Sequence, residues 1–416
     1  MFDRAKQALV KQALEPEWEA KFEPNSYGFR PGRSCQDAME AIFQSICKKP
    51  KFVLDADIEK CFDKISHDKL LAKLSTIPSI TKPIQGWLKA GIFEKGEVFP
   101  SEAGTPQGSV VSPLLANVAL HGLEEMLVNV LPRSRRPKIV RYADDLVILH
   151  PDLETLVELR EQTEAWLGEI GLNLKESKTR ITHTLNEHEG NVGFDFLGFT
   201  VRQYKTGKRR SRQGFKTIIK PSKDAQRRHL ATMAEVIKEN RGSAQADLIF
   251  TLNRKIRGWA NYYRFCCAKQ VFNRMDYQLF WKLRQWAKWR HPHKNKHWQF
   301  QRYWSRRHER LRFCVNETVL GQYAYTPIQR FVKVRGDKSP YDGDWTYWAT
   351  RLGRDPSKPE RITNMLKKQR GKCHKCGLHF RNDDIMETHH IDGERQNNSH
   401  RNLALLHGHC HDEVHR

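Results

Sequence analysis

Apolar residues follow strand-like and helix-like periods in the first half of the chain. The first 200 residues alternate short apolar runs with helical patterns, which is typical of an α+β fold. Lys51–Ile58 predicts a strand, and Pro113–Val130 predicts one continuous helix. Ile139–Leu149 contains two apolar strands separated by Ala143–Asp145, which predicts a β-hairpin with acidic residues at its tip.

The second half of the chain has a different pattern. Residues 203–212 predict a basic loop that contains glycine, and residues 221–310 predict helices rich in basic and aromatic side chains. Residues 337–345, which include proline and glycine, predict a linker. We therefore expect four regions, which span residues 1–220, 221–310, 311–366 and 367–416.

Length and composition limit the classes of protein that this chain can represent. The 416 residues, with an apolar content of 38%, can form several buried cores. The chain has no apolar run long enough to cross a membrane, and residues 1–14 lack the features of a secretory signal. We therefore expect no membrane association, and a place in the bacterial cytoplasm near the nucleoid or in the matrix of an organelle.

The net charge of +24 is concentrated in one block of the chain. Residues 201–340 contain 34 Lys and Arg against 8 Asp and Glu, whereas the remaining residues contain 38 against 40. A solvated surface usually mixes both signs of charge. An excess of one sign among Trp and Tyr side chains instead favours phosphate neutralisation with base stacking. The block therefore indicates a nucleic-acid partner.

Acidic residues occur at two places that nucleotidyl transfer could use. That reaction employs two divalent ions, which carboxylates from separate strands can hold. Asp57 ends the first predicted strand, and Asp144 and Asp145 occupy the predicted hairpin tip. A Tyr-x-Asp-Asp turn alone is often only a solvated β-turn. Here Gly104–Ser109 lies between the two acidic sites and Phe194–Phe199 follows them, and this ordered set indicates a polymerase.

These blocks, together with Ser26–Arg33, resemble the consecutive reverse transcriptase blocks of group II intron-encoded proteins. The resemblance implies a right-hand polymerase palm with partial fingers, followed by an α-helical thumb or maturase domain. It also implies that Asp57, Asp144 and Asp145 are catalytic and hold two Mg²⁺ ions. Asp55 is interpreted as structural.

The same resemblance implies roles for five further residues. Phe62 would exclude a ribose 2′-hydroxyl from the nucleotide site. Gln107 and Gly108 would line the template and the incoming base, and Lys178 would lie near the triphosphate. Arg30, in the first block, would also bind substrate.

Residues 243–304 contain Gly258–Tyr263 and, after this motif, five further tryptophans with many Lys and Arg between them. Most tryptophans in a helical bundle belong to its core, but core packing does not explain the cations. The stretch resembles the thumb or maturase domain of the same family, which grips intron RNA. Gly258–Tyr263 is the most specific part of this resemblance.

The last 50 residues contain two knuckles, Cys373-x-x-Cys376 and His407-x-x-Cys410. Three thiolates and one imidazole at this spacing suit a closed tetrahedral Zn²⁺ site. A unit this small builds little core, so a structural metal is physically expected. The alternative is that these residues are incidental surface cysteines and a histidine.

A second set of residues in this unit suits hydrolysis of a phosphodiester, which needs a base and a divalent cation. The set resembles the HNH, or ββα-metal, nucleases. The resemblance implies that His390 is the general base, that Asn402 fixes the loop presenting it, and that three histidines bind one divalent ion such as Mg²⁺: His389, His411 and His415. The alternative is a degenerate, inactive nuclease.

The resemblance covers the chain in family order. It implies an RNA-directed DNA polymerase and RNA-splicing maturase whose HNH endonuclease nicks target DNA to prime reverse transcription. The expected partners are intron RNA, target DNA and deoxynucleoside triphosphates, and the chain could also form a dimer. Family members carry a further fingers region upstream, whereas this chain starts within a family block. Two alternatives therefore stay open: a splicing-only maturase with an inactive truncated polymerase, and an HNH nuclease that uses the rest as a scaffold.

Overall fold

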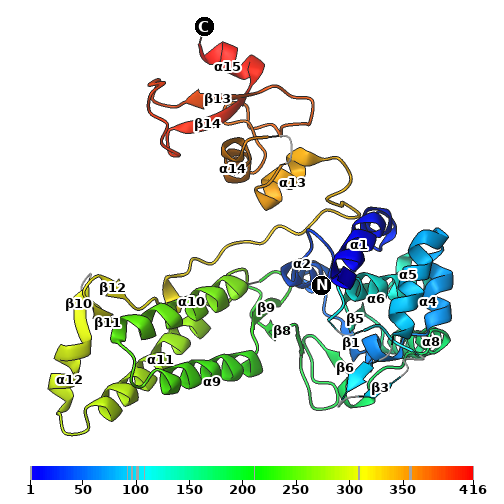
Figure 1. Ribbon diagram of the computed structural model, residues 1–416, viewed down its shortest axis with the longest axis horizontal. Helices are drawn as coiled ribbons and strands as arrows, with labels where there is room; N and C mark the ends of the chain where they lie inside the picture. The colour runs from blue at the N-terminus through cyan, green and yellow to red at the C-terminus, as the bar shows by residue number, and fades with distance from the viewer. Residues whose placement is uncertain are drawn as a thin grey trace.

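The computed structural model describes residues 2–90, 92–94, 97–99, 103–106, 108–209, 211–307, 310–355 and 358–415. Figure 1 shows three bodies, which we call the N-terminal region (residues 2–221), the helical region (residues 222–325) and the C-terminal unit (residues 345–415). The connecting segment, residues 326–344, joins the last two. None of the described helices is long and apolar enough to cross a membrane.

A four-stranded antiparallel sheet in the order β4-β5-β1-β6 lies at the centre of the N-terminal region. Its strands are β1 (Phe52–Asp57), β4 (Lys138–Tyr142), β5 (Asp145–His150) and β6 (Arg180–His183). Val53 and Val147 point into one core, whereas Leu54 and Ile148 point into another. Because both faces are covered, apolar side chains occur at consecutive positions in β1 and β5. The predicted strand and hairpin are confirmed.

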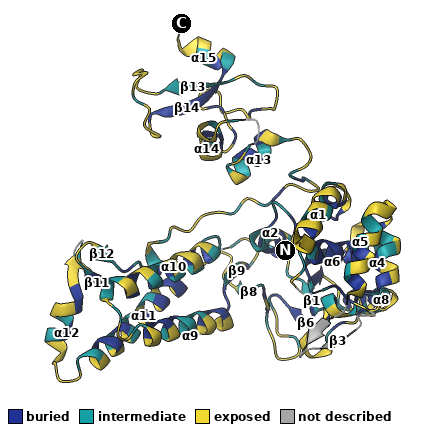
Figure 2. Ribbon diagram, in the orientation of Figure 1, coloured by how far each residue is buried: buried dark blue, intermediate teal, exposed yellow. Residues whose placement is uncertain are grey.

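Helices cover one face of this sheet, and Figure 2 shows their buried sides turned inward. They are α1 (Phe2–Lys21), α4 (His67–Leu74), α5 (Pro78–Lys89), α6 (Ser112–Leu120), α7 (Leu123–Asn129) and α8 (Leu153–Glu169). The prediction of one helix over residues 113–130 is wrong. The chain turns at Gly122, whose φ of +94° interrupts the helical path and starts α7 in a new direction.

The other face of the sheet packs on α2 (Cys35–Ile46) and on a second, three-stranded sheet in the order β7-β8-β9. That sheet is formed by β7 (Phe194–Phe196), β8 (Phe199–Lys205) and β9 (Phe215–Pro221). The predicted basic loop is therefore partly a strand: residues 203–205 extend β8, and the turn follows. Shorter elements complete the region: α3 (Cys61–Lys64), β2 (Ile92–Glu94), β3 (Glu97–Phe99), η1 (Arg133–Arg135) and η2 (Glu176–Lys178).

The helical region shares a single hydrophobic core with the N-terminal region. It contains α9 (Lys223–Glu239), α10 (Gln245–Tyr263), α11 (Lys269–Arg290), α12 (Lys296–Tyr303), β10 (Trp304–Arg307), β11 (Arg310–Val315), β12 (Thr318–Val319) and η3 (Tyr323–Tyr325). Trp304 and Phe313 pack edge to face with ring centroids 5.0 Å apart. The expected boundary at residue 310 therefore falls inside a packed sheet, and the region continues to residue 325.

The C-terminal unit is a compact body with its own core. It contains α13 (Trp345–Leu352), α14 (Glu360–Gln369), β13 (Met386–His390), β14 (Leu403–His407) and α15 (Gly408–Val414). Ala349 and Leu366 belong to the same core as Cys373 and Leu405. The unit therefore begins at α13, whereas the expected boundary at residue 367 falls inside α14.

The connecting segment returns from the helical region to the N-terminal region (Figure 1). The Val334 N–H donates to Asp37 Oδ1 at 2.7 Å, and Arg351 Nη2 pairs with the same oxygen at 2.7 Å. Trp348 packs so closely on Gly32 that a Cβ there would lie 2.5 Å from the indole ring. These contacts attach the C-terminal unit to the N-terminal region.

Candidate functional site

Three carboxylates meet where β1 and the β4–β5 hairpin end. Asp57 lies directly opposite Asp145 in the antiparallel register, and Asp144 occupies the turn between β4 and β5. The Ile58 N–H donates to the Asp144 carbonyl at 3.2 Å, which ties the turn to the end of β1. Because residues directly opposite each other in an antiparallel pair share a face, the Asp57 and Asp145 side chains lie on the same side of the sheet. The sequence predicted this convergence.

The electrostatics of this cluster are those of a cation site. Burial, and then the charges of Asp144 and Asp57, raise the pKa of Asp145 to about 6. Burial also raises the pKa of Asp144, although a backbone hydrogen bond opposes this, and Asp57 adds to the rise. Lys178 forms an ion pair with Asp57. One ammonium against three carboxylates leaves negative charge, and hard divalent cations prefer such converging oxygens.

The hairpin tip is braced by residues that sequence analysis did not single out. Gly28 lies against the turn so closely that a Cβ there would be 2.2 Å from the Ala143 nitrogen. The buried Arg141 donates to Asn117 Oδ1 at 3.0 Å and to the Ala143 carbonyl at 3.3 Å. Asn117 in turn donates to the Gly28 carbonyl at 2.8 Å. An arginine within an otherwise apolar strand was the available signal for this brace.

The other residues that we predicted for the polymerase site differ in their burial and in their contacts. Phe62 is half-buried and packs edge to face on Phe29, with ring centroids 6.0 Å apart. Gly108 is exposed with φ +80°, and Gln107 lies outside the described residues. Arg30 is buried, where it pairs with Glu19 at 2.8 Å and donates to two backbone carbonyls. We therefore interpret Arg30 as structural rather than substrate-binding.

The turn between the acidic sites is tied down by its own neighbours. The Gly104 N–H donates to the Ile65 carbonyl at 2.8 Å, and the Thr105 N–H donates to the Phe62 carbonyl. The Val110 N–H donates to Gln7 Oε1 of α1 at 3.0 Å. The backbone donors at these positions are thus already occupied, and the turn serves to position Phe62 and its surroundings.

Asp55 lies two residues before Asp57 on the same face of β1, and it has its own cationic partner. Arg180 Nη2 lies 3.1 Å from Asp55 Oδ2, across the β1–β6 pair. Burial raises the pKa of Asp55 to about 6, although the positive charge of Arg180 opposes this. This pairing agrees with the structural role that we expected for Asp55.

Gly258–Tyr263 fastens the helical region to the N-terminal region. Tyr262 donates a hydrogen bond to the Leu197 carbonyl at 3.0 Å, and Tyr263 donates to the Gly198 carbonyl at 3.1 Å. A Cβ at Gly198 would lie 2.8 Å from the Tyr263 hydroxyl, so the turn needs glycine for this approach. These two tyrosines of the motif therefore fasten α10 to the turn between β7 and β8.

The tryptophans of the helical region divide between core and surface. Trp286 and Trp304 are buried, whereas Trp281 and Trp289 are about half exposed, at 49% and 53%. Arg241 lies over the Trp289 ring at 4.9 Å from its centroid. The exposed pair lies on α11 among Lys and Arg, where base stacking beside phosphate contacts is available.

Three thiols and one imidazole come together in the C-terminal unit. The donor atoms of Cys373, Cys376, His407 and Cys410 all lie within 4.8 Å of one another. His407 turns Nδ1 towards Cys376 Sγ at 3.4 Å, and its Nε2 lies 3.3 Å from Asp384 Oδ2. A metal-bound histidine typically uses its second nitrogen for such a carboxylate contact. The donor set and its outer partner fit Zn²⁺.

Three histidines form a second cluster, at the side of the ββα arrangement of β13, β14 and α15. The ring nitrogens of His389, His411 and His415 lie within 4.8 Å of one another. His411 Nδ1 contacts Glu387 Oε2 at 2.7 Å, which orients its ring. Burial, and then the charges of His415 and His411, lower the pKa of His389. Neutral imidazoles are the form that binds a divalent metal.

Asn402 holds the loop that follows His390. Its side chain accepts from the Asp392 N–H at 2.9 Å and donates to Asp392 Oδ1 at 2.7 Å. The Asn402 carbonyl accepts from the Ile391 N–H at 2.8 Å. His390 Nε2 is buried without a hydrogen-bond partner among the described residues.

The two larger regions are similar to known families. Residues 1–201 match the family described as reverse transcriptase (RNA-dependent DNA polymerase). Residues 226–304 match the maturase-specific domain of group II introns. These matches coincide with the carboxylate cluster and with the helical region, in the order that the sequence indicated.

Individual relatives resemble the chain more weakly. The group II intron-encoded protein LtrA of Lactococcus lactis is 26% identical over 358 residues, covering 66% of this chain and 58% of its own. An uncharacterized 91 kDa protein in the cob intron of Schizosaccharomyces pombe is 27% identical over 333 residues, covering 63% and 40%. The chain thus spans about half the length of these relatives. A telomerase structure from Candida albicans has a TM-score of 0.37 at 12% identity, covering 73% of this chain and 56% of that one.

Proposed function

Because this chain joins a reverse transcriptase region to a group II intron maturase region, we propose that it is an RNA-directed DNA polymerase that also aids splicing of its intron RNA. The observation that carries the polymerase activity is the register that sets Asp57 opposite Asp145, with Asp144 beside them. The substrates would be a primer, an RNA template and deoxynucleoside triphosphates.

Asp57, Asp144 and Asp145 would hold two Mg²⁺ ions, which neutralise charge that develops on the phosphates and favour attack by the primer 3′-oxygen. The brace of Gly28, Asn117 and Arg141 would keep the hairpin carboxylates in place while charge changes. Phe62 would face the sugar of the incoming nucleotide, and Lys178 would turn from Asp57 towards the triphosphate. Gln107 and Gly108 would line the template base.

Primer extension on an RNA template tests this activity. The expected result is Mg²⁺-dependent addition of deoxynucleotides that EDTA stops and that Asp57→Asn abolishes. The matched control is Asp224→Asn, an exposed aspartate of α9 whose partners are two neighbouring arginines. Equal extension by the Asp57→Asn protein would contradict the role of the carboxylate cluster.

For the C-terminal unit we propose an HNH endonuclease that nicks target DNA and so supplies the primer. The support is geometric: a ββα element bears three clustered histidines, and an adjacent His390 is fixed by the loop that Asn402 holds. His389, His411 and His415 would hold one divalent ion, which stabilises the leaving oxygen. His390 would accept the proton of the attacking water.

The roles of base and ligand are separable by mutation. His390→Ala should abolish DNA nicking and leave Mn²⁺ affinity nearly unchanged, because a base acts in the transition state. His389→Ala should lower both. If excess metal restores nicking to His390→Ala, His390 is a ligand instead of the base.

The four-residue Cys and His set would hold a structural Zn²⁺, since its donors and the Asp384 contact fit that ion. One zinc per chain should co-purify with the protein. Cys373→Ser should lose the metal and unfold the unit, because binding supplies folding free energy in small metal domains. Protein purified without chelator and free of zinc would exclude this site.

A splicing-only maturase is the second candidate. The exposed Trp281 and Trp289 on the basic α11 favour RNA binding whatever the state of the carboxylates. If RNA binding and splicing survive while primer extension fails in the wild-type chain, this candidate replaces the polymerase.

A further inference from the structure

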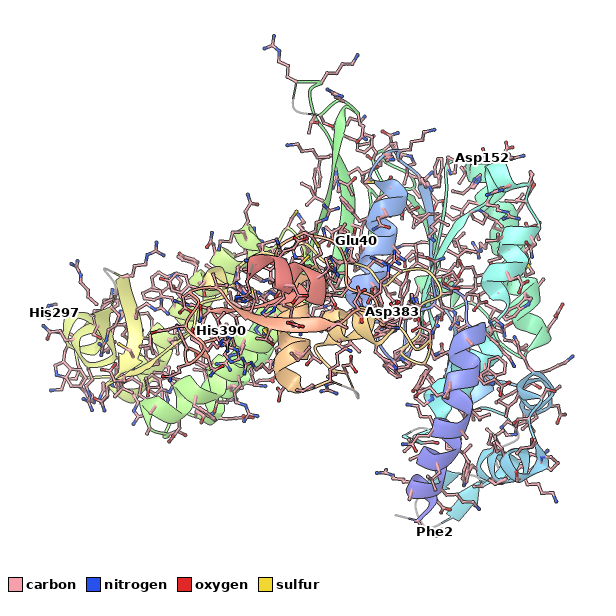
Figure 3. All side chains as sticks on the ribbon, turned by 90° about the horizontal axis from the view of Figure 1, so that it is seen from above. Phe2, Glu40, Asp152, His297, Asp383 and His390 are labelled. Carbon is pink, nitrogen blue, oxygen red and sulfur yellow. The ribbon has the colours of Figure 1, made fainter. Side chains whose placement is uncertain are left out.

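Strands β8 and β9 form a hairpin that projects from the body of the molecule (Figure 3). The strands pair over their whole length, from Phe199 opposite Pro221 to Lys205 opposite Phe215. The turn is closed by its own backbone: the Thr206 N–H donates to the Gly214 carbonyl at 2.8 Å. The hairpin is therefore folded, and we call residues 196–223 the arm.

The charge of this arm has one sign. Residues 196–223 contain nine Lys and Arg and no Asp or Glu. The ion pairs nearest in sequence, Arg180 with Asp55 and Arg227 with Asp224, lie outside the arm, and none among the described residues falls within it. The self-repulsion of so many cations destabilises the free arm, which an anionic partner would relieve.

The register sorts the side chains of the arm onto two faces. Val201 and Gln203 are buried on the face that packs against α2, where Gln203 donates to the Ile46 carbonyl at 2.7 Å. Arg202 and Lys220 lie on the other face, 5.0 Å and 6.0 Å from the ring centroid of Tyr204. Arg202 and Lys220 are half-buried on this face, and exposed cations follow in the turn, which are Lys208, Arg209 and Arg212.

We propose that the β8–β9 arm binds the phosphate backbone of double-helical RNA. Residues 205–214 contain no aromatic side chain, so the turn offers unpaired bases no aromatic ring on which to stack. Its unpaired cations instead suit closely spaced phosphates, whose contacts are independent of sequence. A-form RNA is recognised mainly by shape and by phosphate and 2′-hydroxyl contacts. The choice of RNA rests on the proposed function, which makes folded intron RNA the partner.

Binding of a fully paired RNA stem-loop to the whole chain tests this proposal. The arm variant carries Lys208→Gln, Arg209→Gln and Arg212→Gln, and the matched control carries Lys48→Gln, Lys82→Gln and Lys89→Gln, three exposed lysines elsewhere. Each lost phosphate contact lowers the slope of log affinity against log salt by about 1. For the arm variant, the slope of log affinity against log salt should therefore be smaller by about 3, and the affinity should fall on the order of tenfold or more. The control should keep the wild-type slope and affinity.

Three results would overturn the proposal. One is an arm variant that binds the stem-loop like the control. A second is an equal loss of affinity for unpaired RNA, and a third is a larger loss for a DNA duplex of the same sequence. Nucleotide addition on a short template is measured in parallel with all three proteins. If addition fails in the wild type while stem-loop binding depends on the arm, the polymerase proposal falls and the arm stands.

Discussion

Replacing Gly28 with alanine should damage the polymerase site without touching a carboxylate. The new Cβ would lie 2.2 Å from the Ala143 nitrogen and 2.9 Å from its Cα. The contacted atoms are backbone, so no side chain can rotate away. Ordinary contact distances are about 3.5 Å, so the hairpin turn and residue 28 must separate by about 1 Å. The Asn117 hydrogen bond at 2.8 Å holds Gly28 in place, which directs the shift to the turn that bears Asp144.

A displacement of this size predicts two measurable effects. Nucleotide addition on an RNA template should slow by roughly 100-fold, because a 1 Å misplacement of reacting groups costs about that much. Overpacking should lower the free energy of unfolding by about 1–3 kcal/mol, measured by urea denaturation. Affinity for RNA should be unchanged, since we propose that the helical region and the arm bind the RNA.

The matched control is Gly168→Ala in α8. A Cβ at Gly168 would meet no atom within 4 Å, and alanine in a helix is more stable than glycine by up to about 1 kcal/mol. This variant should keep full activity and gain stability. If Gly28→Ala adds nucleotides as fast as the control, the turn is not braced by the Gly28 contact and the reasoning is refuted.

Three further predictions concern stability and docking. Although burial raises it, the hydrogen bond with His121 and the charge of Arg141 bring the pKa of Glu23 down to about 2. The ionised Glu23 carboxylate therefore stabilises the folded protein fully above pH 4.5, and this stabilisation is lost as the pH falls towards 2. Glu23→Gln should cost about 3 kcal/mol at pH 7 and progressively less in urea melts below pH 4.5; a constant difference would contradict the shift. Arg351→Met leaves the buried Asp37 carboxylate without its cation, which costs about 3–5 kcal/mol, so limited proteolysis should cut the connecting segment faster. Unchanged proteolysis would show that other contacts hold the C-terminal unit. Trp286→Ala should destabilise the helical region by about 3–5 kcal/mol, whereas the exposed Trp281→Ala should mainly weaken RNA binding; equal melting temperatures would refute this division.

The carboxylate cluster was predictable because strand periodicity is a local property. Asp57 ends one apolar run and Asp144 and Asp145 separate two others, so antiparallel pairing brings the three together. The Cys and His sets were also predictable, since the spacing of ligands in sequence limits their geometry. In both cases short stretches of sequence contain most of the information.

Features that depend on contacts between distant segments were not predictable. Nothing near Arg30 in sequence shows that Glu19 pairs with its guanidinium in a buried site. The apolar period of residues 113–130 continues across the break at Gly122, because both helices bury residues in the same core. Gly258–Tyr263 indicated a resemblance to the thumb or maturase domain, but nothing near it in sequence shows that Tyr263 donates a hydrogen bond to the Gly198 carbonyl.

The central claim is that the carboxylates at the end of β1 and in the β4–β5 turn perform RNA-templated DNA synthesis. The most direct test is single-turnover addition of one deoxynucleotide to a primer on an RNA template, with RNA affinity measured on the same preparations. The account predicts addition by the wild-type chain, none by Asp144→Asn, and full addition by Asp195→Asn, an exposed aspartate that pairs with Thr200 at 2.6 Å. RNA affinity should be equal in all three. Addition by Asp144→Asn at the wild-type rate, or no addition by the wild type despite intact RNA binding, would contradict the account.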